Sequence, residues 1–373
     1  MVAAATAPGE NPAAARIDAG EYEVSVAPQL LARAGSIITV AAPAHRYAVV
    51  SDSNVAPIYA KRLTDQLGGA AMLLTIPAGE AYKTRDTWAS LTDQLLESRL
   101  GRDSAIVALG GGVVCDIAGF VAATFMRGVP VVHVPTTLLA MIDASIGGKT
   151  GVDTPNGKNL VGAFHQPRAV IIDPEVLDTL PLADLRAGLA EALKHGAIAD
   201  AEYFDFVSDA APRLLAESPG KRDVLVLNHV IEKSVRLKVG VVAADEREKG
   251  ARKALNFGHT VGHAIELLSG FTMRHGEAVG VGMLLEATAA ERAGVTEPGT
   301  AAGIRAALRS AGLPTERPAG PSASAVLVSM LGDKKSRSGS IEYAVPARIG
   351  VMAAADEGFT VRLPDALVSE VLA

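Results

Sequence analysis

Short apolar runs alternate with segments of helical period through the first half of the chain, and this alternation limits the folds that the chain can adopt. The runs lie at residues 47–50, 71–76, 105–109, 131–134 and 169–172, after an alternating run at 22–26. Segments with a 3.6-residue period, such as 56–67 and 84–96, separate them. Strands that alternate with helices form a largely parallel sheet covered on both faces. We therefore expect an α/β, Rossmann-like domain that binds ligands beyond the carboxyl ends of its strands.

The alternation stops near residue 181, and helical segments then follow one another to about residue 331, before a strand-like run at 341–345. A chain of 373 residues is also too long for one ordinary core. We predict a disordered leader at residues 1–18, rich in Ala and Pro, a dinucleotide-binding α/β domain at 19–177 and an all-α domain at 178–373.

A glycine triplet at 110–112 follows the strand at 105–109 and opens a helical segment. In that context backbone N–H groups and a helix N-terminus can receive a pyrophosphate. Gly110, Gly112 and Cys115 occupy the three glycine positions of the dinucleotide fingerprint, although a plain strand-to-helix turn has the same pattern. Asp52, at the end of an earlier strand, is a candidate for a ribose hydroxyl or for a helix N-cap. The apolar stretch at 105–126 contains the triplet and Asp116, so it is interpreted as a buried strand and helix and not as a membrane span.

The segment at 143–159, DASIGGKTGVDTPNGKN, is too polar for a core and too rich in turn formers for a regular element. We interpret it as a binding loop. Its GGKT resembles the end of a P-loop, but a Walker A motif needs glycine where Asp143 stands, which excludes a nucleoside triphosphatase of that type. Lys149 and Lys158 are candidates for an anionic substrate, with surface lysines as the plainer interpretation.

Three of the eight histidines lie within residues 255–277. His259 and His263 are four residues apart on a segment of helical period, so both imidazoles are expected on one helix face, and His275 follows a break. Three protein ligands with one open position are typical of catalytic zinc, and Glu191, on a helix with Lys194 three residues later, is the candidate carboxylate. The alternative is a set of hydrogen-bonded histidines in a helical core. The charged run at 245–249 is expected to be a solvated connector.

The net charge of −6 gives no global positive field for nucleic acid or an anionic membrane, so we expect neither as a partner. The single cysteine excludes an internal disulfide and fits a cytoplasmic location.

Taken together, the motifs resemble those of the 3-dehydroquinate synthases in the sugar phosphate cyclase family, over residues 20–360. The matching stretches are GGGVVCD at 110–116, PTTLLAMIDASIGGKTGVDTPNGKNLVGAFHQP at 135–167, EALKHG at 191–196, LNFGHTVGHAIE at 255–266, RHGEAVGVGM at 274–283 and DKK at 333–335. The resemblance implies an N-terminal α/β domain with tightly bound NAD, a helical C-terminal domain with a zinc or cobalt ion, and a homodimer.

The resemblance also implies roles for individual residues. It makes Glu191, His259 and His275 the metal ligands and moves His263 beside the substrate, in place of the His259–His263 pair that the helical spacing favours. The residues implied for substrate binding and catalysis are Asp143, Lys149, Lys158, Asn159, Lys194, Lys238, Arg252, Asn256, His263 and Lys335, together with Arg127 of a partner subunit. Those implied for the cofactor are Asp52, Asn54, Glu80, Lys83, Gly111, Gly112, Val113, Asp116, Thr136 and Thr137, with Lys149 and Lys158 shared.

The activity implied is the conversion of 3-deoxy-D-arabino-heptulosonate 7-phosphate to 3-dehydroquinate and phosphate, a step of the shikimate pathway. It proceeds by transient oxidation with NAD, phosphate elimination, re-reduction and an intramolecular aldol closure. The substrate has two anionic ends, which explains an array of cations in an acidic protein. A guanidinium at Arg252, one helical turn before Asn256, is predicted to hold the substrate carboxylate.

Related activities remain as alternatives. Asn256 argues against the 2-deoxy-scyllo-inosose synthases, which have glutamate there, and His263 argues against the valiolone-forming cyclases. An amino-dehydroquinate synthase of secondary metabolism is not excluded by these residues. Alcohol and glycerol dehydrogenases share the architecture but lack the lysine array, and a noncatalytic binding protein would be expected to have lost part of it. Cys115 departs from the glycine usual in the synthases.

Overall fold

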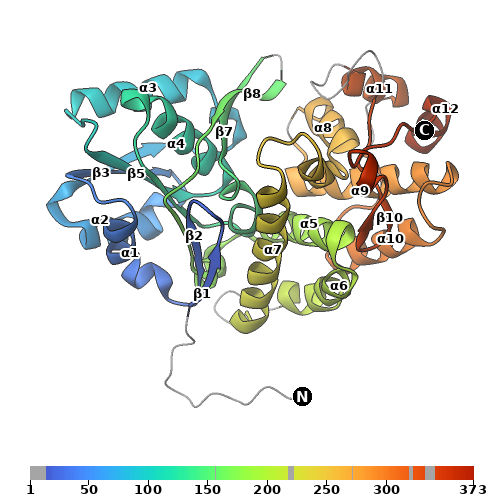
Figure 1. Ribbon diagram of the computed structural model, residues 1–373, viewed down its shortest axis with the longest axis horizontal. Helices are drawn as coiled ribbons and strands as arrows, with labels where there is room; N and C mark the ends of the chain where they lie inside the picture. The colour runs from blue at the N-terminus through green and yellow to red at the C-terminus, as the bar shows by residue number, and fades with distance from the viewer. Residues whose placement is uncertain (1–13, 156, 217–221, 271, 319–321, 332–340) are drawn as a thin grey trace.

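The computed structural model describes residues 14–155, 157–216, 222–270, 272–318, 322–331 and 341–373. An α/β part and a helical part lie side by side, and helix α7 and the β7–β8 hairpin run along their boundary (Figure 1). The elements of the α/β part are β1 (Ala15–Asp18), β2 (Glu23–Val26), α1 (Ala34–Ala41), β3 (Arg46–Asp52), α2 (Lys61–Leu67), β4 (Ala71–Ile76), α3 (Arg85–Glu97), β5 (Ser104–Gly110), α4 (Gly112–Thr124), β6 (Val131–Pro135), β7 (Lys149–Thr154), β8 (Gly157–Phe164) and β9 (Ala169–Ile172).

The main sheet has the strand order β1-β2-β9-β6-β5-β3-β4, and every neighbouring pair is parallel except β1 with β2. The predicted parallel sheet is therefore confirmed. The chain runs from β3 outward to β4 and then returns to β5 on the other side of β3. The carboxyl ends of β3 and β5 thus meet at a point where the strand order reverses, which is where ligands bind in open α/β sheets.

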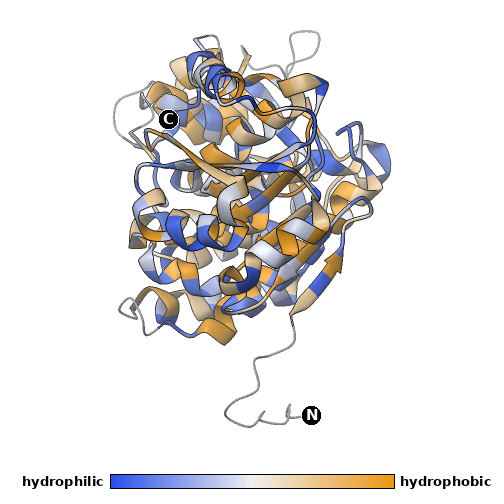
Figure 2. Ribbon diagram, turned by 90° about the vertical axis from the view of Figure 1, so that its left-hand side faces the viewer, coloured by the Kyte–Doolittle hydropathy of each residue, from blue (hydrophilic) through white to orange (hydrophobic). Residues whose placement is uncertain are grey.

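The two faces of the sheet belong to different cores because side chains alternate along each strand. On β5, Val107 and Leu109 pack into a core that continues through the helical part, whereas Ile106 and Ala108 pack into a second core under α3 and α4. The helices of the α/β part carry both hydrophilic and hydrophobic residues (Figure 2), as expected of elements with one buried side. The larger core joins the two parts of the molecule.

The helical part is built from α5 (Leu182–Ala199), α6 (Ala201–Ala216), α7 (Val224–Ala244), α8 (His259–Leu268), α9 (His275–Arg292), α10 (Thr300–Ser310), α11 (Ala323–Leu331) and α12 (Asp365–Leu372). The predicted helical C-terminal part is confirmed. It also contains a small antiparallel pair, β10 (Pro346–Arg348) and β11 (Val351–Met352), so it is not purely α-helical. The predicted strand at 341–345 is reduced to an isolated bridge between Tyr343 and Val361.

Two expectations about the α/β part are wrong. The leader was expected to extend to residue 18, but Ala15–Asp18 forms strand β1, which is paired with β2 and buries Ile17. The 143–159 segment contains most of a hairpin, β7–β8, in place of an irregular loop. Its glycines explain the error: a Cβ on Gly151 or Gly162 would approach the opposite backbone to 2.8 or 2.0 Å, so small residues are needed for pairing here.

The apolar stretch at 105–126 divides into β5, the glycine turn and α4, as predicted. Among the helices of the described residues, none combines the length and apolar character needed to cross a membrane.

Candidate active site

Three candidate metal ligands meet where α5, α8 and α9 come together. Glu191 lies on α5, while His259 and His275 are the first residues of α8 and α9. One ligand atom from each lies within 4.8 Å of the others. The Nε2 atoms of His275 and His259 are 3.4 and 3.7 Å from Glu191 Oε1. This arrangement brings together the donor set that the family resemblance implies.

Each histidine of this set has its other ring nitrogen held in place. Nδ1 of His259 lies 3.2 Å from the carbonyl oxygen of Phe257, and Nδ1 of His275 lies 3.3 Å from Oε2 of Glu266. Such contacts fix the ring orientation and the tautomer, which leaves Nε2 facing Glu191 in both residues. His263 lies on the next turn of α8, with its ring 5.1 Å from that of His259, and is not in the three-residue set.

The buried carboxylate makes the site suitable for a cation. Glu191 is 0% exposed, and within the described residues neither of its oxygens has a hydrogen bond of good geometry. Burial raises its pKa, but the charge of Lys194 and the two histidines outweigh burial and hold that pKa well below the ordinary value. Two imidazoles and one carboxylate are a typical donor set of catalytic zinc, so the residues fit a zinc or cobalt ion.

The protonation of the histidines differs. Burial, reinforced by Lys194, keeps the pKa of His259 well below its usual range. For His275 burial acts in the same direction, but Glu191 and Glu266 outweigh it and raise the pKa to about 9. His259 is therefore ready to bind a cation, whereas His275 must release a proton when a cation binds.

A group of buried charges adjoins the metal set. Lys194 forms an ion pair with Glu191 on the same helix, and Lys238 of α7 lies 2.5 Å from both Oδ1 and the carbonyl oxygen of Asp143. Burial lowers the pKa of Lys238 to about 8 in spite of Asp143. His195 Nε2 is 3.8 Å from Asp143 Oδ1. The predicted substrate residues Asp143, Lys194 and Lys238 thus lie beside the metal set.

A second charged group forms around the 245–249 run, which was expected to be a solvated connector. Glu246, Arg247 and Lys249 are exposed, as expected, but Glu248 is half-buried and accepts hydrogen bonds at 2.6 Å from Lys149 Nζ and from Asn256 Nδ2. Arg252 is 1% exposed, and its two Nη atoms donate to the carbonyl oxygens of Glu246 and Gly147. In this conformation Arg252 therefore joins the segment to the 147–149 turn.

The glycine turn fits a dinucleotide. Helix α4 begins at Gly112, and its N-cap, Gly111, provides no side-chain cap, so the first N–H groups of the helix face outward. A Cβ on Gly111 would lie 3.1 Å from Thr137, and one on Gly112 would lie 3.3 Å from Ala144. The turn therefore offers backbone donors at two glycines, a geometry that suits a phosphate.

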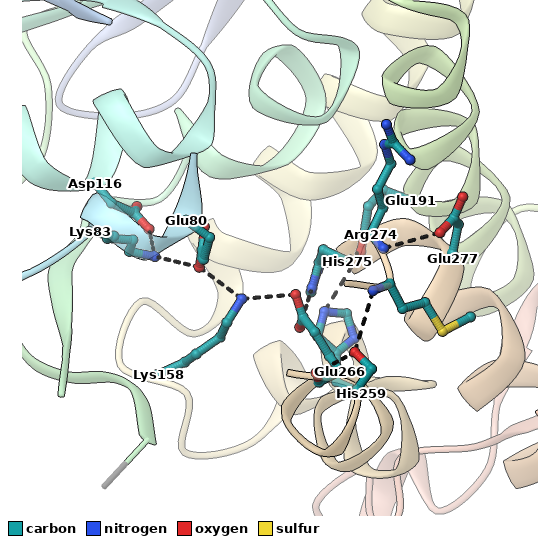
Figure 3. A network of polar contacts seen from close by, with 12 residues as sticks. Glu80, Lys83, Asp116, Lys158, Glu191, His259, Glu266, Arg274, His275 and Glu277 are labelled. Atoms are coloured by element: carbon teal, nitrogen blue, oxygen red, sulfur yellow. Dashed lines mark hydrogen bonds and ion pairs between the residues drawn. The ribbon is translucent and has the colours of Figure 1, made fainter. Parts of the chain in front are cut away.

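Charged residues near the glycine turn line the boundary between the α/β part and the helical part. Lys83 Nζ lies 2.6 Å from Asp116 and 3.9 Å from Glu80, and Lys158 Nζ lies 2.8 Å from Glu80 (Figure 3). A cavity of about 390 Å³ beside them is lined in part by Glu80, Asp153 and Lys158. Four residues predicted to contact the cofactor are thus brought together.

The remaining predicted residues are more dispersed. Asp52 Oδ1 accepts from the backbone N–H groups of Asn54 and Val55, in the turn that follows β3. Thr136 and Thr137 follow β6 beside the glycine turn. The last group consists of Asn159, which has φ 54° on β8, Arg127, which is exposed in the turn after α4, and Lys335, which lies outside the described residues.

Three polar residues at the site were missed by sequence reasoning: Glu248, Glu266 and His195. Glu248 was hidden in a charged run, where solvation is the usual outcome. Glu266 lies seven residues after His259, on the same helix face, and that spacing could have identified it. His195 directly follows Lys194 on an apolar helix, where a buried polar pair signals a site.

Comparison with known proteins gives the family. The 3-dehydroquinate synthase N-terminal model matches residues 73–187, and the C-terminal model matches residues 188–336. The chain is 47% identical to a 3-dehydroquinate synthase of Symbiobacterium thermophilum, over 88% of this chain and 92% of the relative. It is 44% identical to that of Caulobacter vibrioides, over 88% and 90%.

Solved structures agree with this assignment. A 2-deoxy-scyllo-inosose synthase complexed with carbaglucose-6-phosphate, NAD+ and Co2+ has a TM-score of 0.85 at 26% identity, covering 96% of this chain and 99% of that one. A 2-epi-5-epi-valiolone synthase from Streptomyces hygroscopicus, with NAD+ and Zn2+ bound, has a TM-score of 0.80 at 28% identity, covering 95% and 97%. With both family models matched in order and relatives this similar over most of their length, the chain belongs to the 3-dehydroquinate synthase family.

Proposed function

We propose that the chain converts 3-deoxy-D-arabino-heptulosonate 7-phosphate to 3-dehydroquinate and phosphate as an NAD- and metal-dependent lyase, with Glu191, His259 and His275 as the metal ligands. The observation that carries the proposal is the meeting of these three donors within 4.8 Å beside the buried lysines Lys194 and Lys238. A cation site next to positive side chains suits a hydroxylated substrate with anionic ends.

When bound, NAD would accept and return a hydride, and a divalent metal held by Glu191, His259 and His275 would polarise the hydroxyl to be oxidised. The chain's own residues bind and orient the substrate. Lys149, Lys194 and Lys238 offer ammonium donors to its oxygens, and Asn256 can donate to or accept from a hydroxyl without adding charge. Asp143 and Glu248 hold Lys238 and Lys149 through hydrogen bonds and so fix the positions of these ammonium groups.

For the cofactor, we propose that the N–H groups at Gly111, Gly112 and Val113 receive the pyrophosphate. Support comes from the uncapped N-terminus of α4 and from the close packing around the two glycines, where a Cβ would be tightly packed. The remaining residues proposed for the cofactor are Asp52, Asn54, Glu80, Lys83, Asp116, Thr136, Thr137, Lys149 and Lys158.

We also propose a homodimer acting in the cytoplasm, with an α/β domain that includes β1 and extends to residue 177, a helical domain at 178–373 and no nucleic-acid partner. The net charge of −6 supports the last point. Arg127, exposed on the turn after α4, supports the dimer as a residue available to a neighbouring subunit.

The test is to supply the heptulosonate phosphate with NAD+ and Co2+ and to follow phosphate release together with the carbocyclic product. Equal amounts of phosphate and 3-dehydroquinate are expected, with no net NADH. Carbaglucose-6-phosphate, which has no carboxylate, should bind more weakly than the heptulosonate phosphate. Glu191→Gln should abolish turnover and Co2+ uptake together. Phosphate release without the carbocycle, or tighter binding of the carbasugar, would overturn the assignment.

A further inference from the structure

Lys158 lies between two carboxylates that belong to different parts of the molecule. Its Nζ is 2.8 Å from Glu80 Oε1, after β4, and 2.8 Å from Glu266 Oε1, on α8. The side chains of Lys158 and Glu266 are only 17% and 5% exposed. Little solvent screens the contact, so removing one member leaves a poorly solvated charge behind.

Glu266 contacts the metal set with its other oxygen. Oε2 lies 3.3 Å from Nδ1 of His275, whose Nε2 faces Glu191 at 3.4 Å. A carboxylate in this place holds the ring of a metal-binding histidine and raises its basicity. Because Oε1 of the same carboxylate is bound to Lys158, the position of Glu266 depends on the α/β part as well as on α8.

The contacts continue on the cofactor side. Glu80 lies 3.9 Å from Lys83, which is 2.6 Å from Asp116 on α4. Figure 3 shows an unbroken series of contacts from Asp116 through Lys83, Glu80, Lys158 and Glu266 to His275. The series therefore connects the residues around the proposed dinucleotide site with a proposed metal ligand, across the boundary between the two parts.

We propose that Glu266 is a positioning residue for His275, and that the Glu80–Lys158–Glu266 bridge makes NAD and the metal bind more tightly together than apart. This inference rests on the proposed function. A ligand that orders either end of the bridge also orders the other end, so the second ligand meets a site that is already arranged. Linkage requires that each ligand raise the affinity for the other by the same factor.

The experiment uses the full chain after metal removal. Co2+ is titrated by its d–d absorption with and without saturating NAD+, and NAD+ is titrated by calorimetry with and without Co2+. Both comparisons should give one common factor, within the range of roughly 5- to 150-fold that is typical of such coupling.

Two substitutions locate the coupling. Glu266→Gln should weaken Co2+ binding roughly 10- to 100-fold, alter the d–d spectrum and bring the coupling factor close to one, while NAD+ affinity without metal stays unchanged. Glu80→Gln, at the other end, should keep Co2+ affinity without NAD+ but lose the coupling. Lys61→Met is the matched control, because Lys61 forms an exposed ion pair with Asp65 and should leave the coupling factor intact.

The outcomes separate the two proposals. If the wild-type chain binds Co2+ and NAD+ but the coupling factor is one, or if Glu266→Gln leaves both the factor and the spectrum unchanged, the inference is overturned and the proposed function stands. If the folded wild-type chain binds neither ligand, the proposed function fails first. Should Glu266→Gln not fold, Glu80→Gln alone decides the coupling.

Discussion

At the scale of single residues, the buried charged groups at the site form pairs of opposite charge. Lys194 is paired with Glu191 and Lys238 with Asp143, and both lysines are buried. Breaking such a pair by removing one partner typically costs about 3–5 kcal/mol. These residues are therefore poor places to test function by truncation alone, and the informative substitutions keep charge or shape.

Arg252→Lys is one such substitution. The guanidinium donates to the carbonyl oxygens of Gly147 and Glu246, and an ammonium can satisfy them less completely. We expect a loss of about 1–3 kcal/mol in the free energy of unfolding, and a fall in kcat/KM for the heptulosonate phosphate that exceeds any loss of NAD+ or Co2+ affinity. Arg236→Lys, at an exposed pair with Glu232 on α7, should change neither measurement. Unchanged stability and kcat/KM in the Arg252 variant would contradict both assigned roles.

His133 on β6 gives a pH dependence of stability. It is 3% exposed, and burial, with a smaller effect of His165, lowers its pKa from 6.5 to about 4. Between these values the unfolded chain binds a proton that the folded chain does not, so this contribution to stability is present above pH 6.5 and is lost as pH falls toward 4. The shift corresponds to about 3 kcal/mol.

The measurement is urea unfolding of the wild type and of His133→Gln across that pH range. The slope of the unfolding free energy against pH should be smaller in the variant, because glutamine does not titrate. Parallel curves for the two proteins would show that His133 does not carry this proton.

At the scale of elements, α9 holds the N-terminus of α8 through Glu286. Its two carboxylate oxygens accept the N–H groups of Gly258 and Val261, at 2.8 and 2.9 Å, and so provide the cap that Gly258 lacks. Glu286→Gln should lower the unfolding free energy by about 1.5–3 kcal/mol, since one charge-assisted acceptor is lost. Because His259 lies at that end of α8, Co2+ affinity should fall as well.

Glu291→Gln is the matched control on the same helix. Glu291 accepts the N–H of Ala301 near the start of α10, at 2.7 Å, away from the metal set. This variant should lose stability in thermal unfolding and retain Co2+ affinity. Equal losses of Co2+ affinity in the two variants would mean that the cap of α8 has no particular effect on His259.

Strands and helices with a strong hydrophobic period could be predicted from the sequence, whereas strands defined mainly by pairing with another strand could not. Each of the six strands expected in the α/β part corresponds to a strand of the main sheet because its apolar run is bounded by turn residues. Strand β1 was missed because a four-residue strand beside an Ala-rich segment has too little pattern of its own. The β7–β8 hairpin was missed because its glycines, which usually mark loops, are what allow its two strands to approach closely.

At the scale of the whole molecule, the site is made by contacts between distant segments. Lys238 and Asp143 are 95 residues apart, Lys149 and Glu248 are 99 apart, and Lys158 and Glu266 are 108 apart. Spacing along the chain shows only local partners. For this reason the helical period favoured His259 and His263 as a pair of metal ligands, and Glu248 was expected to be solvated. The resemblance to a family supplied the proposed set of metal ligands, which local spacing did not.

The proposed dimer is tested at this same scale through Arg127. The turn after α4 has left-handed φ values at Met126, Arg127 and Gly128 of 51°, 69° and 114°, so Arg127 projects from a constrained backbone on the surface. If Arg127 completes the site of a neighbouring subunit, a heterodimer of Arg127→Ala with Lys194→Met, which keeps the shape of the buried side chain, has one site with both defects and one with neither.

Mixed dimers of this kind, isolated with two different affinity tags, should recover activity from the single intact site, whereas each homodimer should be nearly inactive. Arg99→Ala is the control, since Arg99 is also exposed and has φ 57° after helix α3; its homodimer should keep full activity. Sedimentation must show a dimer at assay concentrations. A monomer that turns over the heptulosonate phosphate, or heterodimers without recovery, would contradict the sharing of Arg127 between subunits, because a mixed dimer regains an intact site only if both defects fall in the same site.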